Sequence, residues 1–161
     1  MKKNILISIV MGSQSDWKIL SSTEKILKDF DIKHEKKIVS AHRTPDRLYD
    51  FAKKIKKRKV EVVIAGAGGA AHLPGMIASK TDIPVIGVPI NATDLRGVDS
   101  LYSIVQMPRG YPVATMAIGS PGAFNAAIFA IQVLAVTDKV IGRKIQDWRA
   151  DTTNRVKNEP E

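Results

Sequence analysis

The sequence contains no cysteine, and its three histidines are scattered along the chain. Disulfide frameworks and thiolate metal sites are therefore excluded, and no histidine pair has the spacing of metal ligands. The chain also lacks a run of about 20 apolar residues, the length that a membrane-spanning helix needs, and no signal-type cleavage site follows residues 1–4. These absences predict a cytoplasmic protein that works without a metal ion, a redox cofactor or a membrane.

Aromatic residues are scarce, at 6% of the chain, although 25 basic residues against 16 acidic ones give a formal charge of +9. Such a charge suits either a nucleic acid or an anionic small substrate. Much of the excess lies in residues 53–59, which are typical of the solvated end of a helix, where cations complement the helix dipole. Because no aromatic residues alternate with this charge, the sequence predicts a small anionic ligand and no nucleic-acid partner.

A length of 161 residues and a hydrophobic content of 44% suit a single catalytic domain, which we expect to span residues 1–161. Short β-branched runs alternate with helical patterns, and Thr44 is a possible helix cap. Buried strands are expected at 5–10, at 38–39 with the residues before them, and at 60–65, 84–88 and 113–118, with helices at 16–30 and 45–55. This alternation predicts an α/β fold, a three-layer doubly wound parallel sheet of flavodoxin-like type.

The C-terminal third has a different pattern. Residues 123–136 are apolar nearly all round, and residues 138–156 form a more polar helical pattern with a frayed tail after about residue 154. A helix that is apolar on every side must be buried on every side. Since a chain of this size has little room to surround a helix at its periphery, we expect the C-terminal helices to pack against other subunits.

Ligands of an open parallel sheet bind beyond the carboxyl ends of its strands, so the loops there are the place to look for a site. The first such loop, residues 11–17, has a turn at Gly12 followed by Ser13, Ser15 and Asp16 at the start of a helix. N–H groups at a helix start favour a phosphate or a hydroxyl-rich ligand. The alternative interpretation is an ordinary helix cap made by one of these polar side chains.

The second loop, residues 40–45, places His42 and Arg43 side by side just before a helix. Histidine titrates near neutrality and serves as a general acid or base, whereas arginine offers a planar fork that suits phosphate. The alternative for a lone loop histidine is a solvated side chain without a function. The neighbouring guanidinium favours a proton-transfer group beside an anion-binding one.

The third loop, residues 65–75, is rich in glycine and alanine, which let a backbone approach a ligand closely. Its residues 66–71 fit the loose dinucleotide-binding pattern. We reject that match because the loop follows the third strand, no acidic residue ends the next strand, and Pro74 is expected to disturb the helix start. We favour a structural or packing role for His72 over a catalytic one, and we expect His34 at the surface without a partner.

Two further polar segments stand at the ends of predicted strands. Residues 97–108 suit a loop and a short helix that cover the site, and residues 120–126 open the long apolar helix; the alternative for both is packing between subunits. The G-x-S-x-G nucleophile elbow, the P-loop and the H-E-x-x-H motif are absent from the sequence, which argues against covalent serine chemistry. What remains is a small-molecule site with one proton-transfer group and loops that suit a phosphate.

These loops resemble those of the N5-carboxyaminoimidazole ribonucleotide mutases of bacterial purine biosynthesis. The resemblance runs from about Ile5 to Trp148, and its motifs are residues 11–17, 40–45, 65–76, 99–110 and 125–127. Several long motifs in the same order are more specific than any single one. The related aminoimidazole ribonucleotide carboxylases of animals have lysine where this chain has Arg43. They also lack the sequence that this chain has at residues 68–72, so the resemblance favours the mutases.

The resemblance implies a homo-octamer without a cofactor, and a reaction that moves the carboxylate of N5-carboxyaminoimidazole ribonucleotide onto ring carbon 4. His42 matches the family's essential histidine and would act as general acid and base. Arg43 would bind the 5′-phosphate, Asp16 the ribose hydroxyls and Ser13 the phosphate region. The other residues that the match places in the pocket are Ser15, Ser40, Ala41, Gly68, Ala70 and Leu73.

Two alternatives stay open. A direct carboxylase would use the decarboxylated ribonucleotide and dissolved carbon dioxide. A non-catalytic regulatory module could share the same fold. A receiver-type regulator, however, needs an acidic cluster where this chain has Met11 and Gly12, and a phospho-accepting aspartate where it has Gly66 and Ala67.

Overall fold

The computed structural model describes residues 6–160, and their centre is a five-stranded, all-parallel sheet with the strand order β2-β1-β3-β4-β5. The strands are β1 (Ile7–Met11), β2 (His34–Ile38), β3 (Val62–Gly68), β4 (Val85–Ile90) and β5 (Ala114–Thr115). This order is that of flavodoxin-like folds. After β1 the chain continues to β2 at one edge of the sheet, and after β3 it continues to β4 on the other side. A crevice therefore opens between the carboxyl ends of β1 and β3.

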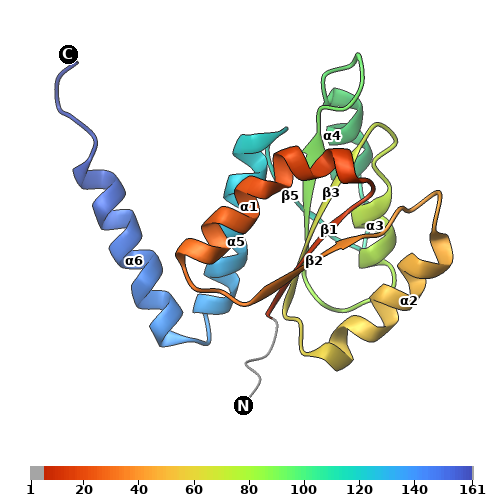
Figure 1. Cartoon of the computed structure of the whole chain (residues 1–161), viewed down its shortest axis with the longest axis horizontal. Helices are drawn as coiled ribbons and strands as arrows, with labels where there is room; N and C mark the ends of the chain where they lie inside the picture. The colour runs from red at the N-terminus through yellow and green to blue at the C-terminus, as the bar shows by residue number, and fades with distance from the viewer. Residues whose placement is uncertain (1–5, 161) are drawn as a thin grey trace.

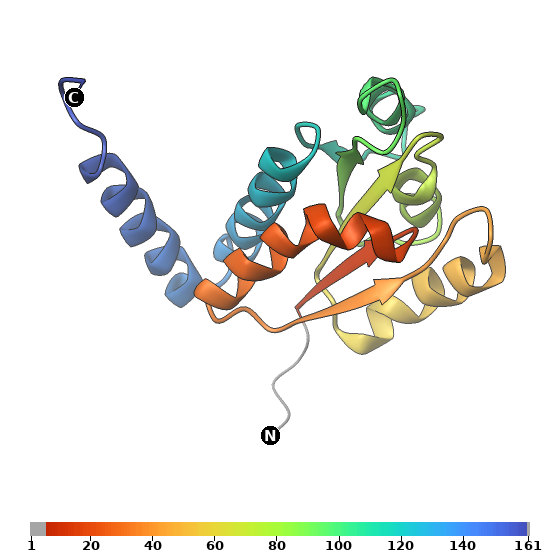
Figure 2. The same cartoon turned by 45° about the horizontal axis from the view of Figure 1, so that its top comes forward.

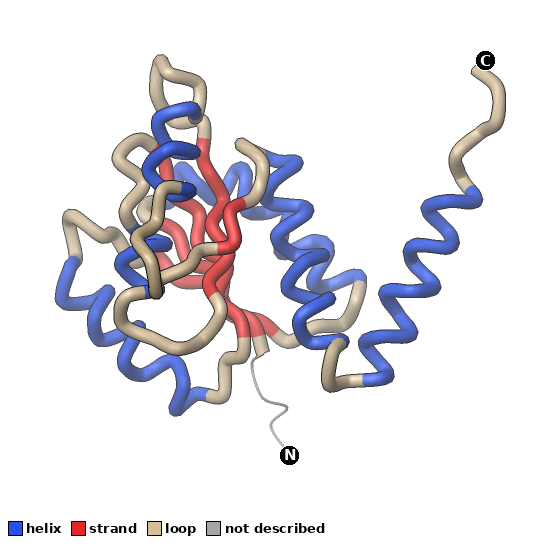
Figure 3. The backbone as a smooth tube through the Cα atoms, turned by 180° about the vertical axis from the view of Figure 1, so that it is seen from behind, coloured by secondary structure: helices blue, strands red, loops and turns tan. Residues whose placement is uncertain are grey.

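Helices cover both faces of the sheet (Figures 1 and 2). Alternate residues of each central strand face opposite sides, so β1 sends Ile7 and Ile9 into one core and Val10 into the other. The first core includes α1 (Trp17–Asp29) and α5 (Ser120–Ala135); the second includes α2 (Pro45–Ile55), α3 (Leu73–Ala78) and α4 (Val98–Val105). Viewed from behind, the sheet lies between two helical layers, which confirms the three-layer α/β prediction (Figure 3).

The structure corrects the prediction that all five strands are buried. Strand β2 pairs with β1 alone, so it is an edge strand, and its residues Lys36, Lys37 and Ile38 are exposed. Strand β5 has two residues instead of the expected 113–118. The residue after β5 still bonds to β4 outside the regular strand, since the N–H of Met116 donates to the carbonyl of Gly87 at 2.9 Å.

The basic segment 53–59 lies where it was predicted, at the end of α2 and in the 3-10 helix Lys56–Arg58 that follows. Part of its charge is paired within the chain. Lys54 contacts Asp50 one turn earlier, and the guanidinium of Arg58 holds both carboxylate oxygens of Glu35 at 2.6 and 2.8 Å. These contacts fit a solvated helix end that is tied to the neighbouring edge strand.

The last helix, α6 (Lys139–Asn154), projects away from the body of the chain (Figures 1 to 3). Its buried residues are Ile141 and Ile145, and Trp148 packs near the rings of Phe30 and Phe124, with centroids 6.1 and 6.2 Å away. Much of its remaining surface is exposed. The neighbouring α5 is not buried on every side either, because the side chain of Phe129 is 39% exposed in the single chain.

Candidate active site

The three loops predicted to form the site meet at the carboxyl edge of the sheet and line one cavity of about 350 Å³. Parallel strands end at the same edge, so loops that are distant in sequence come together there. All ten predicted site residues line this cavity: Ser13, Ser15, Asp16, Ser40, Ala41, His42, Arg43, Gly68, Ala70 and Leu73. Four lining residues were not in the predicted set: Gly12, Ala67, His72 and Ala92.

The two cavity histidines contact each other directly. Nε2 of His42 lies 2.8 Å from Nδ1 of His72, and the two rings are nearly perpendicular, at 86°. At this distance one ring nitrogen donates a hydrogen bond and the other accepts it, so the two rings hold each other in place. A structural or packing role was predicted for His72. Its side chain is exposed in the cavity, just before α3, and its contact with His42 fits a structural role as well as a part in proton transfer.

Arg43 is held in place by the first and second loops. Its Nη2 donates to the carbonyl of Gly12 at 2.9 Å, and both its backbone N–H and its Nε donate to Oγ of Ser40, at 3.2 and 3.3 Å. Thr44 occupies the predicted cap position of α2, but its hydroxyl closes the loop by bonding the backbone of Ser40. Because a guanidinium has more N–H donors than these bonds use, Arg43 can bind a ligand in a fixed orientation.

Asp16 closes the first loop from inside the protein. The side chain is buried, and its Oδ2 accepts the N–H of Ser13 at 3.0 Å, so Ser13 and Asp16 form a capping box at the start of the 3-10 helix Gln14–Asp16, as the alternative interpretation of this loop predicted. Burial raises the pKa of this carboxyl, while the N–H groups of Ser13 and Gly12 and the charge of Arg43 oppose the rise. A carboxyl with a perturbed pKa in a cavity wall is typical of functional sites.

The third loop brings its backbone close to its neighbours. Gly69 has a φ of +66°, which favours glycine, and a Cβ added to Gly68 would lie 2.7 Å from the Cβ of Ala92. The expectation that Pro74 disturbs the following helix is wrong, since α3 begins at Leu73 and includes this proline in its first turn. Proline is tolerated there because the N–H that it lacks has no partner within the helix.

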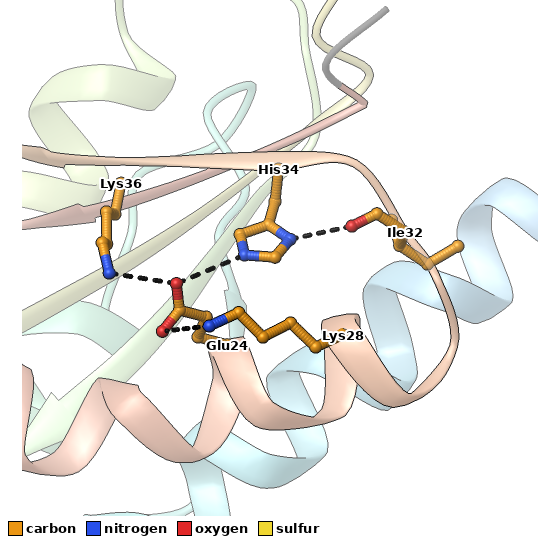
Figure 4. Close-up of polar contacts among 5 residues, drawn as sticks. All are labelled: Glu24, Lys28, Ile32, His34 and Lys36. Carbon is orange, nitrogen blue, oxygen red and sulfur yellow. Dashed lines mark hydrogen bonds and ion pairs between the residues drawn. The ribbon is translucent and has the colours of Figure 1, made fainter. Parts of the chain in front are cut away.

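His34 lies at the opposite end of the sheet from the cavity, at the start of β2, and the prediction that it has no partner is wrong. Its Nδ1 lies 2.8 Å from the carbonyl oxygen of Ile32, and its Nε2 lies 3.6 Å from the carboxylate of Glu24 (Figure 4). Glu24 also holds Lys28 and Lys36, at 3.3 and 3.0 Å. These contacts come from α1 packing across β2, and they connect the helix to the edge strand.

A neighbouring hollow of about 570 Å³ shares Ser15, Asp16 and Ala92 with this cavity and adds Lys18 and Asn91. A larger hollow of about 750 Å³ lies at the opposite end of the sheet, with Lys53, Lys56 and Lys80 among its lining residues. Of the helices in residues 6–160, none is long and apolar enough to cross a membrane. No group of three or more His, Cys, Asp or Glu side chains in that range is arranged to hold a metal ion.

Comparison with known proteins identifies the family. The AIR carboxylase family model matches residues 6–155. The N5-carboxyaminoimidazole ribonucleotide mutase of Escherichia coli K12 is 53% identical over 96% of this chain and 92% of that protein, and the one of Bacillus subtilis is 51% identical over 94% and 93%. The crystal structure of Treponema denticola PurE superposes with a TM-score of 0.85 at 26% identity, covering 93% of this chain and 92% of that one. This chain therefore belongs to the AIR carboxylase family, within its group of N5-carboxyaminoimidazole ribonucleotide mutases.

Proposed function

We propose that this enzyme converts N5-carboxyaminoimidazole ribonucleotide into 4-carboxy-5-aminoimidazole ribonucleotide in de novo purine biosynthesis, with His42 as general acid and base. The observation that carries the proposal is the contact between His42 and His72 in a cavity that Arg43 and Asp16 also line. The cavity thus combines a proton-transfer pair with groups that suit a phosphorylated ribonucleotide. The mutases that this chain resembles are named for the same substrate.

The polar lining residues suit different parts of the substrate. Arg43, already oriented by Gly12 and Ser40, would hold the 5′-phosphate through two N–H donors. The carboxylate of Asp16 would accept hydrogen bonds from the ribose hydroxyls. The hydroxyls of Ser13 and Ser15, which contact each other, would bind near the phosphate. Small or apolar residues of the lining would admit the imidazole ring and the carboxylate, among them Ala41, Gly68, Ala70 and Leu73.

In the proposed reaction, the substrate's N–CO₂ bond breaks, and the amine nitrogen takes a proton from His42 as carbon dioxide forms. The electron-rich ring carbon 4 then attacks the carbon dioxide and forms the new C–C bond. His42 finally removes the proton from that carbon and so regains its starting state. The contact with His72 would let the two rings share this proton. The reaction is redox-neutral and moves a carboxylate that the substrate already carries, so its balance requires no cofactor.

The mutase proposal is tested by following the carboxylate. A mutase must keep the released carbon dioxide beside the ring carbon. Carbon dioxide held there has a very high effective concentration, and escape into water would dilute it. Substrate labelled in its carbamate, converted in excess unlabelled bicarbonate and without ATP, is expected to place most of its label in the product carboxylate. Mass spectrometry of the product measures this fraction, and an incubation without enzyme gives the background loss.

Extensive dilution of the label would contradict the proposal and indicate release and recapture from solution. Turnover that occurs only with the decarboxylated ribonucleotide and dissolved carbon dioxide would identify a direct carboxylase instead.

We also propose that the enzyme works as a homo-octamer in the cytoplasm, with the C-terminal helices in the subunit contacts. The support is the projection of α6 and the apolar surface at its base, where Val136 and Val140 are 84% and 69% exposed in the single chain. Sedimentation at assay concentrations is expected to give a species several times the chain mass of 17.6 kDa. A stable monomer would contradict this proposal.

A further inference from the structure

A buried hydroxyl group binds the backbone of the third loop on the side away from the cavity. Ser100 is a completely buried residue of α4, the helix that packs against β4 and the neighbouring β3. Its Oγ accepts the backbone N–H of Gly69 at 2.9 Å and donates to the carbonyl of Ile90 at 2.7 Å. One side chain therefore connects the third loop to the end of the neighbouring strand.

This connection matters because the loop has no regular ladder of hydrogen bonds there. Strand β3 ends at Gly68, and α3 begins at Leu73. Between them the chain makes a left-handed turn at Gly69, and His72 donates its N–H to the carbonyl of Ala70 at 2.9 Å. Ser103 contributes a longer contact, with its Oγ 3.3 Å from the carbonyl of Gly69. The position of the loop is thus decided largely by α4.

The loop residues beside this anchor face the cavity. Gly68, Ala70 and His72 line the cavity, whereas Gly69 lies behind them on Ser100. The contact between His42 and His72 spans 2.8 Å, and hydrogen bonds weaken steeply when their distance or angle departs from the optimum. A loop shifted by about 1 Å would therefore separate the two rings and move Gly68 and Ala70 in the cavity wall.

We propose that Ser100 is a positioning residue for carboxylate transfer, which holds the loop of residues 68–72 so that His72 meets His42. This inference rests on the proposed mutase function. Ser100 does not touch the substrate; it acts through the backbone of Gly69. A purely structural buried hydrogen bond would stabilise the fold without affecting turnover, and this difference makes the inference testable.

Thr23 provides a matched control. Like Ser100 it is completely buried, and its Oγ1 donates to the carbonyl of Ala123 at 2.7 Å, where α1 packs against α5. The variants Ser100→Ala and Thr23→Val each remove one buried hydroxyl, and both are expected to lower the melting temperature. Only Ser100→Ala is expected to lower kcat, by about 10-fold, with a smaller change in KM, because a displaced loop affects the transition state more than ground-state binding.

Amide hydrogen exchange of the peptide spanning residues 66–73 adds a readout that does not depend on activity. Loss of the Ser100 acceptor is expected to speed exchange of the Gly69 amide, and Thr23→Val is expected to leave this peptide unchanged. If Ser100→Ala fails to fold, Ser100→Cys keeps a side chain of similar shape with a weaker donor and acceptor, and is expected to show the same two changes to a smaller degree.

Faster exchange at Gly69 combined with wild-type kcat would overturn the inference, as would a kcat for Ser100→Ala equal to that of Thr23→Val. A wild-type enzyme without mutase turnover would count against the proposed function instead, and the two failures are therefore distinguishable.

Discussion

The variant His42→Asn is expected to turn over at least about 10²-fold more slowly than the wild-type enzyme while binding the nucleotide product with nearly unchanged affinity. General acid and base catalysis contributes about 10²- to 10⁴-fold, and an asparagine amide cannot exchange a proton near neutral pH. It can still occupy the space beside His72 and donate a hydrogen bond. Steady-state kinetics measures the first effect, and titration calorimetry with the product measures the second.

The matched control is His34→Asn, the same substitution at a histidine that lies at the far end of the sheet. His34 contacts Glu24 and the backbone of Ile32, so this variant is expected to be less stable but to keep its kcat. Near-normal turnover in His42→Asn would remove His42 from the proposed mechanism. A loss of kcat that appears equally in both variants would point to a general effect of destabilisation.

The second large effect is expected at Arg43. The variant Arg43→Ala is expected to bind the phosphorylated product about 10- to 100-fold more weakly, because hydrogen bonds to charged groups are worth about 1.5–3 kcal/mol. The affinity for the dephosphorylated nucleoside is expected to change little. Titration calorimetry with both ligands separates loss of the phosphate contact from disturbance of the loop, which would weaken both.

Two further variants sharpen this test. Arg43→Lys keeps the charge without the planar fork and is expected to be intermediate. Arg47→Ala removes a guanidinium in the first turn of α2, four residues after Arg43. Nη1 of Arg47 donates to the carbonyl of Ile38 outside the cavity, so this variant is expected to bind both ligands normally. Equal losses for nucleotide and nucleoside in Arg43→Ala would mean that the phosphate binds elsewhere.

The main features of the fold and the members of the cavity could be predicted from the sequence because both depend on local patterns. The β-branched runs and the helical periods between them predict a parallel sheet with helices on both faces. Once the strands are parallel, the loops containing Asp16, His42 and Gly68 must emerge at the same edge. The prediction that these loops share one site therefore follows from topology.

Errors arose where neighbours in space decide the environment of a residue. β2 was expected to be buried, but strand order places it at an edge; its own residues His34–Ile38 are mostly polar, and Lys36 and Lys37 are typical of an edge strand, a signal that the prediction missed. Pro74 was judged from the rule for helix interiors, although it stands in the first turn of α3, where the rule does not apply. His34 seemed unpartnered because Glu24 reaches it from a different element.

The sequence by itself determined the class of fold, the edge that carries the site and the family, since each depends on residue types in a fixed order along the chain. Only the tertiary structure decided which side chains meet. His42 and His72 are 30 residues apart in the sequence, Ser100 and Gly69 are 31 apart, and Thr23 and Ala123 are 100 apart. Contacts within 3 Å depend on how helices pack against the sheet, and spacing along the chain does not specify that packing.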